Sequence, residues 1–212
     1  MKIAHKIVMI SLLIISAFAN SQNNNDKNKE YNNIADALVN PEKVYRLNLS
    51  NQKVMISDDE WSRFINLEYL NLENYHLKEI PIGITNLKNL KVINLNGNDF
   101  RKLPLEFSNL TNLEELYLNN EKNIDLPKTL TVLSKLPKLT SLHLENDNLK
   151  KLPIEILELE NLENLYLNHN KLEDIPKIKT LDHLKYLDLN DNKIDPKLLD
   201  MRNLNFGFKI NF

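Results

Sequence analysis

The chain has 212 residues, of which 42% are hydrophobic and 26% are charged, and it contains no cysteine and only three glycines. Without cysteine, disulfide bridges, cysteine-ligated zinc, a thiol nucleophile and a lipid-modified N-terminal cysteine are all excluded. Gly83, Gly97 and Gly207 stand alone, whereas phosphate-binding loops need several glycines close together, so we expect no nucleotide site. The net charge of -2 provides no basic field, so we expect no nucleic-acid partner.

Residues 1–21 have the order of a secretory signal peptide. Lys2 and Lys6 come first, an apolar run follows over residues 7–15, and small residues end the segment. The run is shorter than the about 20 residues that cross a bilayer, which disfavours an uncleaved anchor. Cleavage fits after residue 19 or after residue 21, and we favour the second site, which leaves Gln22 first. We therefore expect a secreted or periplasmic protein of the cell envelope that is not a lipoprotein.

Residues 22–33 are almost entirely Asn, Lys, Asp and Glu, and no apolar residue comes before Tyr31. Such a segment buries too little surface to offset the entropy lost when a chain becomes ordered. We expect a flexible, Asn-rich spacer.

From residue 44 to residue 203 the chain repeats itself with a period of about 23 residues. Each copy carries the pattern LxxLxL and then a second apolar phrase that begins with LP in most copies. A degenerate copy begins at Val44, which gives about seven copies in all. The later copies begin at Leu67, Leu90, Leu113, Leu139, Leu162 and Leu184.

The two halves of a copy have different structural meanings. The LxxLxL half has the two-residue alternation of a strand, so its leucines point inward and the residues between them point outward. Strands of successive copies then pair in a parallel sheet, and the second half returns the chain along the opposite side. Because one copy cannot bury its own apolar face, the array is stabilised by stacking of neighbours.

The phrase LPxx(I/F)xxLxxL resembles the bacterial and Ras-group repeats of the leucine-rich repeat superfamily, over residues 44–194. The resemblance implies an α/β solenoid, a right-handed curved stack with a parallel sheet on the concave face and short helices or 3-10 turns on the convex face. The preceding segment resembles the short helix that often comes before such arrays, and we expect a capping helix over residues 34–43 that covers the open edge of the first strand. These motifs are specific for the fold and not for function.

Several copies depart from the family pattern. The family's ninth position usually holds Asn, whose amide satisfies backbone groups of the loop. Tyr75 and Glu121 cannot reproduce that donor and acceptor, so we expect irregular loops there and, in the longer copy, a bulge over residues 119–138. The first copy instead carries Ser57 and Glu60 at capping-box spacing, which predicts a short helix with Trp61 facing inward.

Residues 204–212 alternate apolar and polar side chains, which predicts a strand that caps the last repeat. The terminal Phe212 also resembles the end of an outer-membrane barrel, but a closed barrel needs about eight or more such strands and the sequence offers one. The outer edge of the capping strand could pair with another chain.

Residue patterns for chemistry are absent or incomplete. His143 and Glu145 share one face of a strand, but one histidine and one carboxylate do not make a metal site. The segment 188–192 begins like a calcium loop, but Lys193 stands where the loop needs Gly and Leu199 where it needs Glu. Neither HExxH nor GxSxG occurs. We therefore expect no catalytic role, no metal and no cofactor.

The outward-facing positions of the expected sheet carry the candidate site. Adjacent strands lie about 4.8 Å apart, so Tyr117, His143 and Tyr166 should form a contiguous aromatic strip, with Tyr186 diagonal to it. Exposed tyrosines beside polar groups are typical of protein-binding hot spots, although β-propensity alone also favours Tyr on strands. The candidate partner-binding residues are Tyr117, His143, Tyr166, Tyr186, Glu115, Glu145 and Asp188.

Acidic residues outnumber basic ones around this strip. We therefore expect a protein or peptide partner that carries basic groups, bound across the concave face. Glycan binding is the alternative, because rows of Tyr, His, Asn and Asp also suit sugars, and surface display toward a host is a third reading.

Overall fold

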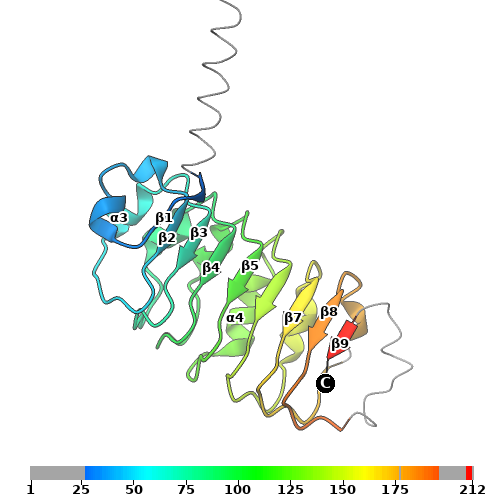
Figure 1. Cartoon of the computed structure of the whole chain (residues 1–212). Helices are drawn as coiled ribbons and strands as arrows, with labels where there is room; N and C mark the ends of the chain where they lie inside the picture. Colours follow the sequence, from blue (N-terminus) through cyan, green and yellow to red (C-terminus); the bar gives the residue numbers. More distant parts are fainter. Residues whose placement is uncertain (1–26, 177, 196–208, 212) are drawn as a thin grey trace, which may run out of the picture.

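The computed structural model describes residues 27–176, 178–195 and 209–211. Over these ranges the strands form one parallel sheet in sequence order, and the helical turns lie behind it (Figure 1). The strands are β1 (Glu30–Tyr31), β2 (Arg46–Asn48), β3 (Tyr69–Asn71), β4 (Val92–Asn94), β5 (Glu115–Tyr117), β6 (Ser141–His143), β7 (Asn164–Tyr166), β8 (Tyr186–Asp188) and β9 (Lys209–Asn211). This is the leucine-rich repeat solenoid that the periodicity predicts.

The returning half of each repeat forms a short helix. The α-helices are α2 (Ile34–Ala37), α3 (Asp58–Ser62) and α4 (Leu126–Leu133). The 3-10 helices are η1 (Pro41–Lys43), η2 (Ile82–Asn86), η3 (Leu105–Asn109), η4 (Ile154–Glu158) and η5 (Ile178–Thr180). No helix within the described ranges is long and apolar enough to cross a membrane. The expected signal peptide over residues 1–21 lies outside these ranges.

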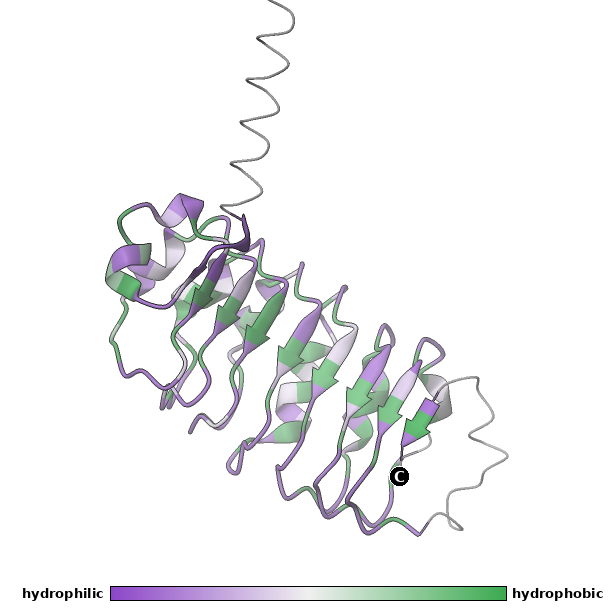
Figure 2. Ribbon diagram, in the orientation of Figure 1, coloured by the Kyte–Doolittle hydropathy of each residue, from purple (hydrophilic) through white to green (hydrophobic). Residues whose placement is uncertain are grey.

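The core runs along the inside of the stack. The middle residue of each strand from β2 to β8 is buried, and except for Val92 in β4 the residues beside it are polar or are Tyr or His (Figure 2). Register is maintained from strand to strand, so Leu116 pairs with Leu142 and Leu142 with Leu165. Leucines from the returning half close the core from behind. The same register fixes the order of the outward-facing side chains.

The N-terminal segment differs from the prediction in two ways. Glu30 and Tyr31, which the composition assigns to the flexible spacer 22–33, form β1 and pair in parallel with β2. The open edge of β2 is therefore covered by a strand and not by the expected capping helix. That helix is also split, because α2 ends before Leu38 and η1 follows it after a turn. Composition does not predict β1, because its sequence is polar and the strand is ordered by its pairing with β2.

The capping box predicted at Ser57 is confirmed. Its hydroxyl oxygen accepts a hydrogen bond from the Glu60 backbone, and the Glu60 side chain accepts one from the Ser57 backbone. These bonds satisfy free N–H groups at the start of α3. The helix turns Trp61 inward, where it is 1% exposed and packs against Phe64.

The irregular loops expected at Tyr75 and Glu121 are not present. The hydrogen bond from Asn74 N to Asn96 O and the one from Asn120 N to Glu145 O continue the pattern of the neighbouring repeats. Tyr75 instead donates its hydroxyl to a carbonyl of the preceding repeat, and one Glu121 carboxylate oxygen accepts the backbone N–H of Asn98. Each substitute therefore satisfies enough of the backbone to maintain the turn.

The longer repeat does not bulge over residues 119–138 either. Its extra residues form α4, an eight-residue α-helix where neighbouring repeats have 3-10 turns. The Asp125 side chain caps the helix by accepting the backbone N–H of Lys128, and Leu130 and Leu133 face the core. The insertion is thus accommodated behind the sheet without disturbing it.

The predicted capping strand is described only in part. Lys209–Asn211 forms β9 and pairs in parallel with β8, with Ile210 opposite Leu187. Residues 204–208 and residue 212 lie outside the described residues. Over its three described residues the strand extends the sheet past the last repeat, as the alternation predicts.

Candidate functional site

Three aromatic rings lie at the third position of consecutive strands, β5 to β7, and a fourth lies at the first position of β8. The ring centroids of Tyr117 and His143 are 3.9 Å apart at 14°, and those of His143 and Tyr166 are 4.1 Å apart at 5°. Tyr186 lies 5.2 Å from Tyr166 and is tilted by 47°. The structure therefore brings together the four rings that register predicts, and we call these four residues the aromatic strip.

Two carboxylates fix the histidine of the strip. Nε2 of His143 lies 3.1 Å from Oε1 of Glu115, and Nδ1 lies 3.2 Å from Oε2 of Glu145. Tyr117 donates its hydroxyl to the same Glu115 oxygen over 2.8 Å. The hydrogen bond from His143, and then the one from Asn119, holds the pKa of Glu145 below its ordinary value. With His143 only 8% exposed, these contacts hold the centre of the strip in one orientation.

The tyrosines of the strip are neutral hydrogen-bonding groups. Burial, then the hydrogen bond and charge of Glu115, raises the pKa of Tyr117. Burial and the nearby carboxylates also raise the pKa of Tyr166, whose hydroxyl has no hydrogen-bond partner within the described part of the chain. Tyr186 donates to Oδ2 of Asp188 over 3.0 Å. Because stacked rings cover one another's faces, the strip presents ring edges and hydroxyl groups outward.

The strip replaces residues that have a structural role in other repeats. At the same position, Asn48, Asn71 and Asn94 each accept the backbone N–H two residues further on, over 3.1, 2.9 and 2.9 Å. Asp188 does the same in β8 over 3.1 Å. The phenyl rings of Tyr117 and Tyr166 have no acceptor near the backbone, and both ring nitrogens of His143 contact carboxylates, so three consecutive repeats lack this bond.

Neighbouring repeats compensate for part of this loss. Asn96 accepts the backbone N–H of Asn119, and Asn119 accepts that of Glu145, each over 2.8 Å. Two repeats after Asn119, Oδ1 of Asn168 is buried without a partner within the described ranges. The backbone N–H groups of Asn119 and Glu145 therefore keep an acceptor without help from the rings, which indicates that the turns themselves do not require the rings.

The charges beside the strip are partly paired. Lys91 contacts Glu68 over 2.7 Å, and Lys185 contacts Glu163 over 2.8 Å. Glu114 makes no ion pair with any described residue. The centre of the sheet face, over β5 to β7, therefore retains an excess of carboxylates.

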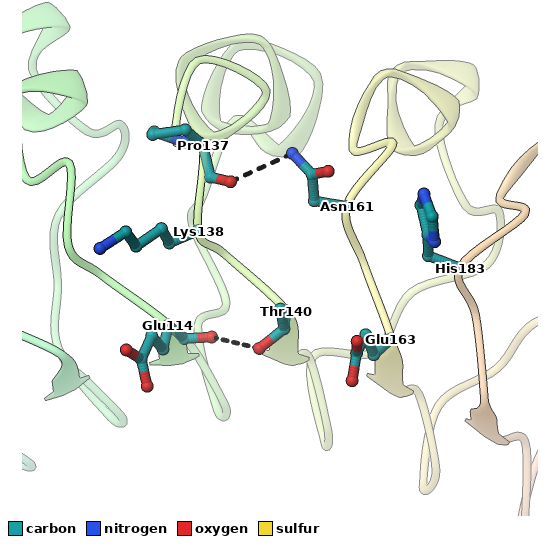
Figure 3. A pocket seen from close by; sticks show the side chains of 7 residues that line it. All are labelled: Glu114, Pro137, Lys138, Thr140, Asn161, Glu163 and His183. Carbon is teal, nitrogen blue, oxygen red and sulfur yellow. Dashed lines mark hydrogen bonds between the residues drawn. The ribbon is translucent and has the colours of Figure 1, made fainter.

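A groove crosses the starts of β5, β6 and β7, beside the strip (Figure 3). Glu114, Thr140 and Glu163 stand in a row along it, with Asn161 and His183 to one side. Thr140 belongs to no recognisable sequence motif, because a short side chain between longer ones forms no pattern. Only its position in the register reveals it.

Two carboxylates are buried behind the loops that follow β5 and β6. Glu121 is 2% exposed and Asp147 is 7% exposed, and one oxygen of each has no partner among the described residues. Burial raises the pKa of Glu121 to about 8 and that of Asp147 to about 7. No three His, Asp or Glu side chains in the described ranges are grouped so that they could hold a metal ion.

Comparison with known proteins agrees with the geometry. Family models described as "Leucine-rich repeat region" and "Leucine rich repeat" match residues 42–142, 137–194 and 183–210. No curated protein sequence matches the chain.

Solved structures of leucine-rich repeat proteins superpose on the chain. A leucine-rich repeat protein of Leptospira interrogans is 29% identical, with a TM-score of 0.60 over 86% of this chain and 58% of that one. Internalin C2 of Listeria monocytogenes is 23% identical, with a TM-score of 0.59 over 78% and 70%. A complex of TLR13 with ssRNA13 is 24% identical, with a TM-score of 0.69 over 86% and 26%. The last two likenesses concern the fold alone, and the chain spans little more than half of the Leptospira protein. The repeat, the parallel sheet and the family matches together place this chain among the leucine-rich repeat proteins.

Proposed function

We propose that this chain is a non-catalytic binding protein whose aromatic strip contacts a protein or peptide on the concave face of the sheet. The observation that carries the proposal is the replacement of the turn-stabilising residue by Tyr117, His143 and Tyr166 in three consecutive repeats. Since Asn at this position stabilises the turns of β2, β3 and β4, the turns do not require aromatic rings, and we attribute the rings to a contact outside the chain. Tyrosine presents a large, rigid surface with a polar hydroxyl, which suits the centre of a protein interface.

The partner's surface carries basic groups. Glu115 and Glu145 flank His143. Glu114, at the start of β5, forms no salt bridge with a described residue, and its charge acts on Lys91 of the preceding strand only at longer range. Carboxylates arranged in this way attract basic segments, steer their approach and repel acidic ones.

Sugars and nucleic acids suit this surface less well. A sugar ring packs on the face of an aromatic ring, but both faces of His143 and one face each of Tyr117 and Tyr166 are covered by stacked rings. Although the related TLR13 structure holds a single-stranded RNA, the carboxylates of the present chain would repel phosphate groups. Both ligand classes are nevertheless alternative outcomes of the experiment below.

We also propose that residues 1–21 act as a cleaved signal peptide, which would present the binding face outside the cytoplasm or in the periplasm. N-terminal sequencing of the protein made in its natural host tests this. A mature chain that begins at Gln22 supports the proposal, and one that begins at Met1 contradicts it.

The binding proposal is tested by cross-linked capture with designed variants. A double change, Tyr117→Asn and Tyr166→Asn, introduces the residue that β2, β3 and β4 carry at this position, so the fold is maintained. The control is Ile154→Gln on η4, behind the sheet, where the side chain is 62% exposed. We expect a protein that cross-links to the wild type and the control and not to the double variant. Capture that is equal for all three, or specific binding of a glycan or single-stranded RNA in place of protein, contradicts the proposal.

A further inference from the structure

Residues just before the strands form ion pairs between neighbouring strands at two places in the sheet. Lys91 donates its backbone N–H to the carbonyl of Glu68, and Lys185 donates to that of Glu163. In both cases the side chains also form an ion pair across the strands, over 2.7 and 2.8 Å. Glutamate on one strand and lysine on the next is thus a recurrent unit of this sheet face.

One such unit lacks its cation. Thr140 donates its backbone N–H to the carbonyl of Glu114 over 2.9 Å, which is the bond that the two lysines make in their units. Its short side chain reaches only the carbonyl oxygen of Glu114, over 3.3 Å, and leaves the carboxylate without an ion pair among the described residues. The groove of about 500 Å³ lies over Thr140, where the other units carry a lysine side chain (Figure 3).

We propose that this groove receives a basic side chain of the protein partner, which takes the place of the missing lysine between Glu114 and Glu163. The inference deepens the proposed function and rests on it, since it adds the place on the sheet where one cation of the partner binds. Glu114 and Glu163 are two strands apart, about 10 Å along the sheet. Their carboxylates can therefore approach a guanidinium or ammonium group from both sides, with Thr140 below it.

The other polar groups of the groove leave this position open. The amino group of Lys138 bonds Oδ1 of Asn112 over 2.7 Å and points away from Thr140 (Figure 3). The amide of Asn161 donates to the carbonyl of Pro137, so it is also engaged. Oε2 of Glu163 contacts Lys185, and Oε1 makes no hydrogen bond or ion pair with any residue in the described part of the chain. His183, at the far side, is the remaining titratable group that lines the groove.

A matched pair of peptides tests the proposal on the full chain. The probes are acetyl-Gly-Arg-Gly-amide and the same peptide with citrulline, which keeps the shape of arginine without its charge. Backbone amide NMR signals are followed during titration to millimolar concentrations. We expect the arginine peptide to shift the signals of Glu114, Thr140 and Glu163, and the citrulline peptide to leave them unchanged.

Substitutions then identify the site. Thr140→Lys supplies the cation from within the chain and should abolish the response, whereas Thr140→Val keeps the side chain short and should preserve it. Glu114→Gln should weaken binding about two- to fivefold, which is the range of an exposed ion pair. Glu106→Gln removes an exposed carboxylate on η3 and serves as the charge control.

Equal responses to the two peptides, or an arginine response that survives in Thr140→Lys, overturns the inference. This outcome is distinct from failure of the proposed function. If the Tyr117→Asn and Tyr166→Asn variant no longer binds the partner and the groove does not bind the arginine peptide, the proposed role of the strip is supported and the proposed role of the groove is refuted. If the groove binds the arginine peptide but the Tyr117→Asn and Tyr166→Asn variant captures the partner as well as the wild type does, the proposed function is refuted.

Discussion

Asp147 provides a sharp test of how the repeat satisfies its buried polar groups. Asn98 and Asn170 occupy the same position in other repeats. Each donates its amide to the carbonyls of leucines directly after the strands, and its oxygen accepts backbone N–H groups. Asp147 makes only the second kind of contact, since Oδ1 accepts the N–H of Glu121 over 2.6 Å and Oδ2 has no partner within the described ranges. We predict that Asp147→Asn stabilises the protein at neutral and alkaline pH.

The magnitude follows from the pKa of Asp147, which burial raises from its ordinary 3.8 to about 7. Between these values the folded chain binds more protons than the unfolded chain, so the free energy of unfolding falls as pH rises through this window and is lowest above it. This difference between the folded and unfolded pKa of Asp147 corresponds to a loss of about 4 kcal/mol in the free energy of unfolding above the window. Asparagine removes the charge and restores the amide donor, so we expect a gain of about 2–4 kcal/mol at pH 8 and a much smaller one at pH 4.

The assay is urea unfolding of the wild type and Asp147→Asn across this pH window. Asp182→Asn, at an exposed carboxylate, is the control and should leave the pH dependence as in the wild type. Because burial also raises the pKa of Glu121, from 4.5 to about 8, the variant should retain the part of the decline that Glu121 causes between these pH values. A stability gain that is the same at pH 4 and pH 8, or a loss at pH 8, would refute the reasoning.

Three further changes test the packing of the solenoid. Leu142→Ala opens a cavity at a fully buried strand position and should cost about 2–5 kcal/mol in urea unfolding, so a loss below about 1 kcal/mol contradicts the continuous core. Ser57→Ala removes the cap of α3 and should lower stability by about 0.5–2 kcal/mol, with Ser57→Asp as the variant that retains it. Gly83→Ala places a methyl group 2.5 Å from the carbonyl oxygen of Asp58 and 2.7 Å from Cβ of Trp61, so thermal unfolding should begin at a lower temperature, and an unchanged midpoint contradicts this close approach.

Features of the structure that are set by the repeat period can be predicted from the sequence. Because strand alternation fixes which side chains face outward and the period fixes which ones are neighbours, the order Tyr117, His143, Tyr166 can be read without coordinates. The capping box of α3 is predicted for the same reason, since its hydrogen bonds are local.

Features that depend on contacts between repeats are not predictable in this way. β1 has a polar sequence and is ordered through its pairing with β2. The loops at Tyr75 and Glu121 stay regular because side chains reach across to neighbouring repeats. The groove over Thr140 arises because one cross-strand unit lacks a lysine that others carry. In each case the signal lies in a comparison between repeats and not in a motif within one.

The central claim is that the aromatic strip is the binding surface. Its most direct test is the dissociation constant of the captured protein partner, measured by calorimetry for the wild type, the Tyr117→Asn and Tyr166→Asn variant, and Ile154→Gln, with thermal unfolding as the check on folding. If the strip is the centre of the interface, the double variant should bind about 100-fold more weakly or worse, and Ile154→Gln should bind as the wild type does. A folded double variant whose affinity stays within about twofold of the wild type would contradict the account.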